Sequence, residues 1–587
     1  MRAFWNEIRN KKRNKVASNL QPNDFKQFYS SIMQEDYTEA PIDRDISQHV
    51  DSYYAKYVDC HNVSTLDSTH IIKLIDKCRH NASPGVDGIT AEHLQYGKSD
   101  VLCNLLASLF NIILSHNCIP SSFCHGVIVP LLKKPTLNPN QPENYRPITI
   151  STTLSKILEF MLIPDADICD TQLGFREGRG TSFGSRLLSD TISYFKYQRS
   201  PIYVCSLDAE KCFDNICHTY LFYKLIDILP FSHWVLCYKW YSKLKATVKW
   251  LGKYSVCFKV TKGTRQGSIL SPYFFNVFIN DLLVGLQTDY SGVAIGNLKF
   301  NSFTYADDVT VYSTSATGLQ MLIDRCYMYS QRWRFKFGIK KTKCIVIGKN
   351  ILKCEPEWFL GTLKISKEQQ LEILGTTFTC KYNYNDHVDN RIRKCRQAYY
   401  SLTKCGMAYP GATTDVKSYL WKSICAPVLM YGHDGLSIGR NNIQKLDTAQ
   451  GNLIKQAMGL SKRAHTTELL LSLGIKRIDE GLNKSIVSLY NRIFKVNNPL
   501  QDLTMYLLSQ YITHGTVISG TIIDDILQMG LSPTSCIFNN HKQVLSTSSN
   551  ISGNGHVDSI RALIHHENFI KPYSEEHTLV NLLTKSF

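Results

Sequence analysis

The sequence predicts an α+β fold that is followed by an all-helical region. From about residue 125 to residue 380, strand-like and helical segments alternate, which is typical of a mixed core of sheet and helix. Residues 127–134 favour a short buried strand, and residues 202–208, rich in β-branched and aromatic side chains, favour another. After residue 385 the apolar residues recur at helical spacing. The expected helices are 389–405, 414–429, 442–458 and 467–473.

Charge and composition limit the classes of protein that this chain can represent. The 587 residues include 66 Lys and Arg against 49 Asp and Glu, and 43% of them are hydrophobic, as in globular proteins. Residues 501–587 hold four basic and seven acidic residues, so residues 1–500 carry the net positive charge. This excess favours a polyanionic partner, although a merely soluble basic protein has the same signature.

The cysteines and the apolar segments indicate a protein of the cell interior. The 19 cysteines are scattered and form no Cys-x-x-Cys pair, so we expect buried thiols rather than a zinc finger or a disulfide scaffold. The N-terminus has no apolar signal region, and the apolar stretch 101–115 suits a buried helix better than a membrane span. We therefore expect no membrane contact and a location in the nucleus, the cytoplasm or both.

Three aspartates stand at positions that suit metal chemistry. Asp208 ends the predicted strand 202–208, and Asp307 and Asp308 form the acidic turn between two strand-like halves of residues 303–312. Adjacent carboxylates repel each other unless a cation or solvent screens them, and an all-oxygen set suits Mg²⁺. Two such ions, with Mn²⁺ as an alternative, can activate a 3′-hydroxyl and stabilise a leaving pyrophosphate. An Asp-Asp pair alone is more typical of an ordinary exposed turn.

The order of three segments carries a resemblance to a known family. Tyr305-Ala306-Asp307-Asp308, residues 206–214 and residues 263–272 resemble the catalytic boxes of the reverse transcriptase of non-LTR (LINE-type) retrotransposons. The resemblance covers about residues 75–380 and continues more weakly to about residue 475. Shorter matching blocks lie at 143–148, 156–159, 172–176, 341–343, 373–375 and 429–432.

The resemblance implies a right-hand polymerase and an activity. It predicts fingers at 76–195, a palm with an antiparallel sheet at 196–380 and a helical thumb at 381–475. A basic helical connector at 1–75 and a C-terminal region of unknown role at 476–587 complete the expected chain. The implied reaction is RNA-directed DNA synthesis, in which deoxynucleotides extend a DNA primer on an RNA template. No segment resembles the endonuclease that accompanies such enzymes, so we expect that domain to be absent.

The resemblance also assigns roles to residues. Asp208, Asp307 and Asp308 are the expected catalytic metal ligands. Lys341 is the expected proton donor to pyrophosphate, although an ordinary exposed lysine would look the same. Phe213 is expected to exclude a 2′-hydroxyl, although a core phenylalanine would look the same. The other expected nucleotide-binding residues are Gln266, Gly267, Arg146, Lys156 and Arg176, and Tyr305, Ala306 and Arg265 flank the motifs.

Basic residues within 240–265 and 391–396 are interleaved with Trp240, Tyr241 and Trp250. They are expected to grip an RNA–DNA duplex through its backbone, unless they are solvated loops beside core aromatics.

Two other functions stay open from the sequence. One is a catalytically inactive, nucleic-acid-binding remnant of such an element, which would keep the basic surface. The other is an RNA-directed RNA polymerase, which Phe213 and the Tyr-Ala-Asp-Asp box disfavour.

Overall fold

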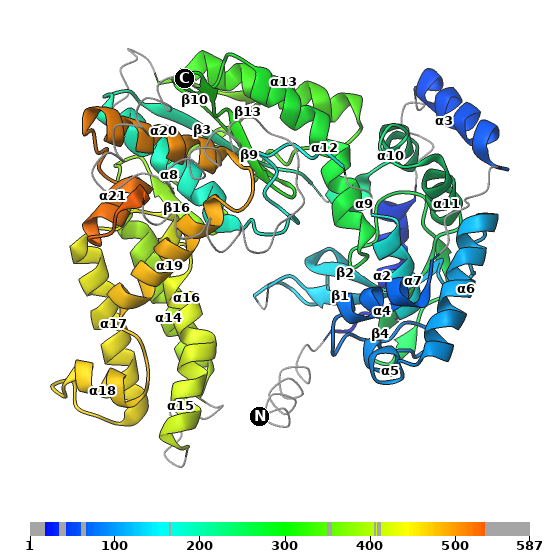
Figure 1. Ribbon diagram of the computed structural model, residues 1–587, viewed down its shortest axis with the longest axis horizontal. Helices are drawn as coiled ribbons and strands as arrows, with labels where there is room; N and C mark the ends of the chain where they lie inside the picture. The colour runs from blue at the N-terminus through cyan, green and yellow to red at the C-terminus, as the bar shows by residue number, and fades with distance from the viewer. Residues whose placement is uncertain are drawn as a thin grey trace, which may run out of the picture. The chain divides into compact units, whose positions relative to one another are not determined.

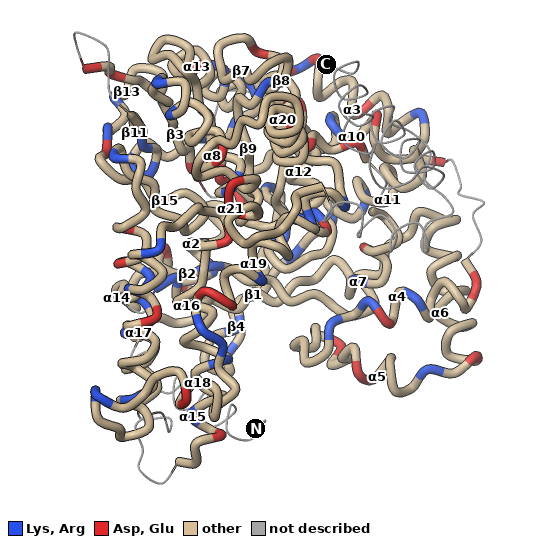
Figure 2. Tube along the Cα trace, turned by 60° about the vertical axis from the view of Figure 1, so that its left-hand side comes forward, with Lys and Arg blue, Asp and Glu red and all other residues tan. Residues whose placement is uncertain are grey.

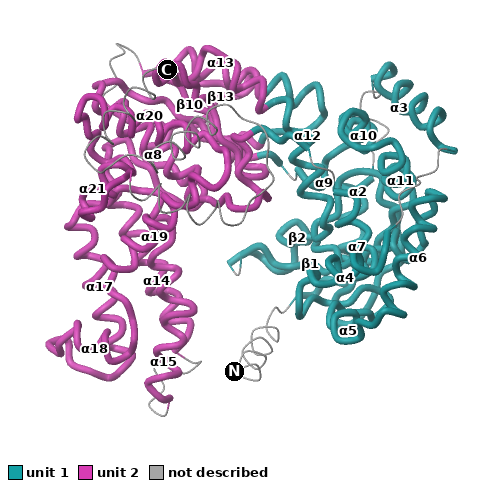
Figure 3. The backbone as a smooth tube through the Cα atoms, viewed as in Figure 1, with its two compact units in different colours: residues 1–169, 209–282, 327–337 teal, residues 170–208, 283–326, 338–587 magenta. Residues whose placement is uncertain are grey.

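The computed structural model describes most of the chain, and its helices and sheets confirm the mixed fold class. The described residues are 18–34, 43–59, 66–134, 136–163, 166–210, 212–348, 355–403, 407 and 412–534. Parts of the predicted segments 1–75 and 476–587 therefore lie outside the described residues. The chain forms two compact units, each discontinuous in sequence (Figures 1 and 3). Unit 1 holds residues 1–169, 209–282 and 327–337, and unit 2 holds residues 170–208, 283–326 and 338–587.

Unit 1 contains a mixed five-stranded sheet. Its strand order is β2–β1–β4–β5, and β6 also pairs with β4. β1 runs antiparallel to β2 and parallel to β4. The strands are β1 (His125–Leu132), β2 (Tyr145–Ile150), β4 (Lys245–Trp250), β5 (Lys253–Tyr254) and β6 (Phe258–Lys259). The strand predicted at 127–134 is thus confirmed, two residues earlier.

Helices make up most of the rest of unit 1. They are α2 (Pro22–Met33), α3 (Arg44–Tyr57), α4 (Ser68–Lys77), α5 (Ala91–Tyr96), α6 (Asp100–His116), η1 (Pro142–Asn144), α7 (Thr153–Met161), α9 (Cys212–Asn215), α10 (His218–Leu225) and α11 (Phe231–Ser242). Two longer helices, α12 (Leu270–Thr288) and α13 (Ala316–Arg332), are divided between the units.

Helix α6 differs in one respect from its prediction. Ser99 caps its N-terminus by accepting a hydrogen bond from the Leu102 N–H, and Asn117 ends it in the left-handed conformation. One face is buried in the core, whereas Leu105 and Ile112 on the other face are 65% and 56% exposed. The helix is therefore confirmed, but its burial is limited to one face.

Among the described residues, no helix combines the length and apolar character that crossing a bilayer requires.

Unit 2 contains the sheet that carries the predicted aspartates. Its strand order is β14–β11–β3–β10–β9, and neighbouring strands are antiparallel except for β11 and β14. The strands are β3 (Ile202–Asp208), β9 (Ser302–Tyr305), β10 (Asp308–Ser313), β11 (Lys343–Ile347) and β14 (Ser366–Lys367). The strand predicted at 202–208 is confirmed at both ends. Ser206 and Asp208 are partly exposed and share one face, whereas the rest of β3 is buried, so this face opens only at the end of the strand.

The rest of unit 2 is mainly helical. Its helices are α8 (Thr181–Tyr197), α14 (Asn385–Ser401), α15 (Thr414–Leu420), the π-helical turn η3 (Trp421–Cys425), α16 (Ala426–Met430), η4 (His433–Gly435), α17 (Arg440–Met458), α18 (Thr466–Ser472), α19 (Ile478–Ile493), α20 (Pro499–His514) and α21 (Ile522–Gln528). Its remaining strands form three short hairpins: β7 (Ala294–Ile295) with β8 (Leu298–Lys299), β12 (Phe359–Leu360) with β13 (Leu363–Lys364), and β15 (Gln370–Ile373) with β16 (Thr376–Thr379). The four helices predicted after residue 385 are confirmed to within a few residues at most ends. Helix α14 packs against α16 and α17 (Figure 1).

A buried ion cluster ties α21 to α8. Arg186 is fully buried, with its Nε 2.7 Å from a carboxylate oxygen of Asp190 and its Nη1 2.6 Å from one of Asp525. Asp190 also accepts a hydrogen bond from the Ile522 N–H at the start of α21. Burial raises the pKa of the Asp190 carboxyl, and the positive charge of Arg186 opposes that rise. Helix α21, which follows the predicted thumb, is therefore tied into unit 2.

We predict that Arg186→Met destabilises the fold, because it leaves two buried carboxylates without a cation. The expected loss in the free energy of unfolding is about 3–5 kcal/mol, measured as a shift of the urea midpoint. The control is Arg477→Met, which breaks the exposed pair of Arg477 and Asp479 and is expected to cost no more than about 1 kcal/mol. Equal shifts for the two variants would contradict this role of the cluster.

Candidate active site

The pairing of three strands in unit 2 gathers the predicted aspartates. Across the antiparallel pair of β10 and β3, Asp308 lies directly opposite Asp208. Across the pair of β10 and β9, Asp308 lies opposite Tyr305, which leaves Ala306 and Asp307 as the two turn residues. Residues directly opposite each other in an antiparallel sheet point to the same face. The register therefore brings Asp208 and Asp308 together at the open end of β3, with Asp307 adjacent.

The electrostatics of this cluster reflect its excess of carboxylates. Burial, followed by the negative charges of Asp307 and Asp208, raises the pKa of Asp308 to about 6. Lys341 opposes that rise and donates hydrogen bonds to both carboxylate oxygens of Asp208, at 3.0 and 2.8 Å. The hydrogen bond with Asp208 also raises the pKa of Lys341. The ammonium of Lys341 thus offsets part of the negative charge of the cluster.

A second turn delivers Lys341 to the cluster. The Gly338 N–H donates to the carbonyl of Asp208 at 2.8 Å. The N–H groups of Lys341 and Thr342 then donate to the carbonyl of Gly338 at 3.1 and 2.9 Å. Because this turn is fixed to the last residue of β3, the lysine side chain lies beside the aspartate that ends the strand.

The donor chemistry of the cluster suits a hard divalent cation, but its arrangement is not that of a preformed metal site. Three carboxylates supply only oxygen donors, which Mg²⁺ prefers. In the part of the chain that the structure describes, no group of three or more His, Cys, Asp or Glu side chains is arranged to hold a metal ion. The ammonium of Lys341 instead occupies both oxygens of Asp208. An ion would have to replace Lys341 there.

The loop 171–174 supports the acidic turn, and sequence reasoning gave it no role. Gln172 is fully buried, and its Oε1 accepts hydrogen bonds from the N–H groups of Gly174 and Ala306 at 2.9 and 3.0 Å. Ala306 has a φ of +57°, which is uncommon for a residue with a side chain. The sequence signal was the Gln-x-Gly spacing within the block 172–176.

Phe213 and Gln266 lie together in unit 1. The ring of Phe213 lies 5.0 Å from that of Phe275, and the side chain is partly exposed. The Nε2 of Gln266 donates to both carboxylate oxygens of Asp214, at 2.9 and 3.1 Å. The adjacent backbones are also joined, since the Thr264 N–H donates to the carbonyl of Phe213. The two sequence boxes therefore form one local structure, in which Asp214 fixes the amide of Gln266.

The backbone around position 267 leaves room only for glycine. Its φ is +117°, and a Cβ atom there would lie 2.6 Å from the carbonyl oxygen of Thr149. The Thr149 N–H in turn donates to the carbonyl of Gln266 at 2.7 Å. The backbone at Gly267 thus lies directly against strand β2.

Arg265 is buried and makes its contacts inside the protein. Its guanidinium lies 3.0 Å from the fully buried carboxylate of Glu159 and over the ring of Trp240. Glu159 also accepts a hydrogen bond from the hydroxyl of Ser268 at 2.8 Å. The arginine of the motif therefore joins α7 to the segment that leads into α12.

The remaining predicted cations differ in exposure. Arg146 on β2 is exposed, and Lys156 on α7 is partly exposed. In unit 2, Arg176 lies 3.4 Å from the carboxylate of Asp170 and is 25% exposed.

The two units divide the predicted site residues into two groups. Unit 2 holds Asp208, Asp307, Asp308, Lys341, Tyr305, Ala306 and Arg176, and unit 1 holds Phe213, Gln266, Gly267, Arg265, Arg146 and Lys156.

The aromatic residues interleaved with the predicted duplex-binding lysines and arginines are mostly internal. Trp240 and Tyr241 are 1% and 3% exposed, so they belong to the core, which is the alternative that the sequence left open for them. Trp250 is only partly exposed and packs against Phe25 and Tyr145. The nearby lysines do reach solvent: Lys243, Lys245, Lys249, Lys253 and Lys259 are exposed.

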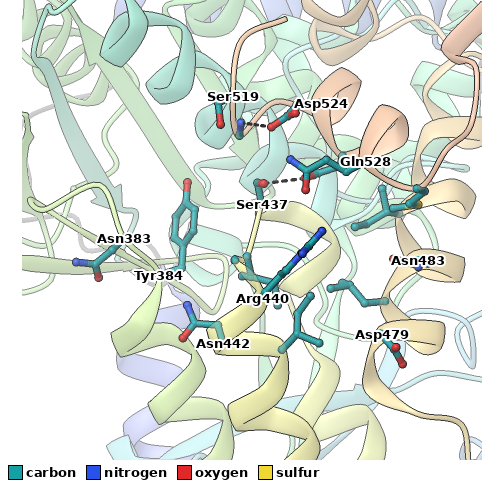
Figure 4. Close-up of a pocket in the computed structure, with 18 of the residues that line it drawn as sticks. Asn383, Tyr384, Ser437, Arg440, Asn442, Asp479, Asn483, Ser519, Asp524 and Gln528 are labelled. Carbon is teal, nitrogen blue, oxygen red and sulfur yellow. Dashed lines mark hydrogen bonds between the residues drawn. The ribbon is translucent and has the colours of Figure 1, made fainter.

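A cavity of about 810 Å³ in unit 2 is separate from the predicted site residues, since none of them lines it (Figure 4). Its acidic side chains already have partners. Asp525 accepts hydrogen bonds from Ser437 and Arg186, and Asp524 accepts one from the Gly520 N–H. The cavity therefore offers no unpaired carboxylate cluster that would rival the one at the end of β3.

Comparison with known proteins assigns the class of the domain. Residues 132–378 match the family described as "Reverse transcriptase (RNA-dependent DNA polymerase)". This range contains all three of the motifs that carry the resemblance. Over residues 132–378 the chain is therefore similar to reverse transcriptases.

Individual relatives indicate which kind of reverse transcriptase the chain is similar to. The chain is 22% identical over 431 residues to the probable RNA-directed DNA polymerase from transposon BS of Drosophila melanogaster, which covers 70% of this chain and 47% of that protein. It is 22% identical over 439 residues to the RNA-directed DNA polymerase from mobile element jockey of the same fly, covering 72% and 47%. It is 24% identical over 319 residues to the Pol polyprotein of the type-2 retrotransposable element R2DM, covering 51% and 29%.

These relatives come from non-LTR elements, which confirms the resemblance predicted from the sequence. The chain spans about half the length of the first two.

We predict that Gly267→Ala lowers the stability of the protein more than Gly252→Ala. Both glycines have positive φ, but a Cβ atom at Gly252 meets open space, whereas at Gly267 it meets the Thr149 carbonyl. Gly252→Ala is expected to cost about 1 kcal/mol from backbone strain alone. Gly267→Ala adds the displacement of β2, so its thermal midpoint is expected to fall further, and equal midpoints would contradict the close approach.

Proposed function

We propose that this chain is an RNA-directed DNA polymerase of a non-LTR retrotransposon. It extends the 3′-hydroxyl of a DNA primer with deoxynucleotides on an RNA template. The observation that carries the proposal is the register that sets Asp208 opposite Asp308, beside Asp307, within a reverse transcriptase domain. Clustered carboxylates at the open end of a sheet are suited to metal-assisted phosphoryl transfer.

We further propose the right-hand arrangement that the sequence implies. Residues 76–195 would be the fingers, residues 196–380 the palm and residues 381–475 the thumb. The antiparallel core β11–β3–β10–β9 supports a palm, and the packed helices α14, α16 and α17 support a thumb. Residues 1–75 would be a connector. Helices α19, α20 and α21 of the region 476–587 would brace the palm through α8.

The three aspartates are proposed to hold divalent cations, Mg²⁺ in the cell and Mn²⁺ as a substitute. When bound, these ions would supply charge stabilisation for the attacking and leaving oxygens. Asp208 and Asp307 would be the main ligands, and Asp308 a weaker one. In this proposal Lys341 releases Asp208 and becomes the proton donor for the departing pyrophosphate, because its ammonium is already held at that carboxylate.

The unit 1 residues are proposed to bind the nucleotide. Phe213 would exclude a 2′-hydroxyl, and the Asp214 carboxylate would leave the Oε1 of Gln266 as the part of its amide that contacts nucleotide or template. Arg146 and Lys156 of unit 1, and Arg176 of unit 2, would contact phosphates, since phosphate oxygens favour cationic donors.

The proposed partners are the RNA template, the DNA primer and deoxynucleotides. Lys and Arg residues occur along both units (Figure 2), and the exposed lysines of β4, β5 and β6 suit contact with a nucleic-acid backbone. Such a reaction takes place inside the cell, and we propose the nucleus, the cytoplasm or both as its location.

A second candidate is an inactive nucleic-acid-binding remnant of such an element. The observation that favours it is the ion pair of Lys341 with Asp208, together with the lack of a preformed set of three metal ligands among the described residues. Such a protein would bind a template–primer duplex without extending it.

Primer extension on an RNA template with Mg²⁺ separates the two candidates. We predict extension by the wild type and a loss of more than about 100-fold in Asp307→Asn, because one metal ligand loses its charge. Asp386→Asn is the matched control, since Asp386 is an exposed carboxylate at the start of α14. Tight duplex binding by the wild type without extension would favour the remnant.

A further prediction concerns the choice of sugar. Phe213→Ala is expected to raise the ratio of ribonucleotide to deoxynucleotide incorporation by about tenfold or more, because space opens for a 2′-hydroxyl. A tenfold change in this ratio corresponds to the relief of a clash of about 1.4 kcal/mol. Phe213→Tyr retains the ring and is expected to retain the preference. The measurement is the ratio of kcat/KM for the two nucleotides, and an unchanged ratio in Phe213→Ala would assign Phe213 to the core alone.

A further inference from the structure

The turn that presents Asp307 and Asp308 has an unfavourable backbone. Tyr305 and Asp308 pair across β9 and β10, so the chain reverses over only two residues, Ala306 and Asp307. Ala306 has a φ of +57° and is 5% exposed. A residue with a Cβ atom in the left-handed region costs free energy that its surroundings must offset. Something outside the hairpin therefore has to hold this turn.

One side chain binds both backbone polar groups of Ala306. The Oε1 of Gln172 accepts the Ala306 N–H at 3.0 Å, and its Nε2 lies 3.5 Å from the Ala306 carbonyl oxygen, to which it donates. The same Oε1 accepts the N–H of Gly174 at 2.9 Å. Gln172 is 0% exposed, so water does not compete for these hydrogen bonds.

The loop that carries Gln172 is anchored by its own backbone. The Leu173 N–H donates to the carbonyl of Thr304 at 2.8 Å, and the Thr304 N–H donates to the carbonyl of Thr171 at 2.9 Å. A Cβ atom at Gly174 would lie 2.3 Å from the nitrogen of Ala306, so only glycine fits there. The loop therefore stays beside β9 whatever side chain stands at position 172.

We propose that Gln172 is a positioning residue that fixes the turn and so sets the carboxylates of Asp307 and Asp308 for metal binding. The role of Gln172 in metal binding rests on the proposed function. Its stabilisation of the turn does not. An amide is the group that fits, because it offers an acceptor for two N–H groups and a donor for the carbonyl. A methionine of similar length offers neither of these hydrogen bonds.

The test uses the full chain with Gln172→Met and three measurements. Hydrogen exchange is followed in the peptide that contains residues 303–312, Mn²⁺ binding is followed by electron paramagnetic resonance, and the Mg²⁺ midpoint is taken from primer extension. We expect exchange at Ala306 to become about tenfold faster or more, because its N–H loses its acceptor. We expect the metal midpoints to rise about fivefold to tenfold, with the KM for deoxynucleotide little changed.

Two further variants separate positioning from folding. Gln450→Met is the control, because Gln450 is also buried in unit 2 and donates to one backbone carbonyl, that of Lys476. It is expected to leave the exchange of 303–312 and the metal midpoints unchanged. Ala306→Gly in the Gln172→Met background is expected to restore much of the metal affinity, since glycine adopts positive φ without a Cβ penalty.

Several results would overturn the proposal. Unchanged exchange at Ala306 in Gln172→Met would show that the turn needs no external hold. A lower thermal midpoint with unchanged metal midpoints would assign Gln172 to folding alone. A wild type that neither binds Mn²⁺ nor extends primers, while the exchange effect persists, would refute the proposed function and the metal role of Gln172, but not its hold on the turn.

Discussion

The candidate site depends on one register, the antiparallel pairing of β3 with β10. Leu207 pairs with Val309 and Cys205 with Val311, and all four are fully buried. Val204 and Tyr312 on the opposite face are fully buried as well, so a shift of one residue would exchange the side chains that pack on the two faces, and packing of both faces fixes the alignment. The same alignment forces Asp208 against Asp308. The core thus supplies the free energy that holds two carboxylates side by side, and burial, followed by the neighbouring negative charges, raises the pKa of Asp308 there.

The parts around this register are held in place by buried polar contacts. In unit 2, the Gly338 turn and the Gln172 loop bind the backbone at the two ends of the cluster. In unit 1, Glu159 holds Arg265 and Asp214 holds Gln266. Each contact satisfies a buried donor or acceptor that would otherwise cost free energy. The motif residues are therefore presented by partners that do not themselves touch a substrate in the proposed reaction.

Local sequence patterns predicted the elements well, and long-range partners poorly. The strand 202–208, the acidic hairpin and the helices after residue 385 follow from residue type and spacing, because these patterns act within one element. Arg186 meets Asp525 and Gln172 meets Ala306 across 339 and 134 residues, and no periodicity encodes such pairs. Trp240 and Tyr241 show the same limit, since an aromatic residue among lysines has the same local pattern on a surface as in a core. The wider family resemblance identified the three aspartates, but not what holds them.

The ion pair between Lys341 and Asp208 is weak evidence for an inactive protein. Lys341 is 71% exposed and Asp208 is 22% exposed, so solvent screens their attraction. Pairs of this kind contribute about 0–1 kcal/mol, and a divalent cation beside three carboxylates has a larger charge to offer. In the proposed reaction the lysine would therefore be a partial counter-ion that a metal displaces, which would leave its ammonium beside the site as the proposed proton donor.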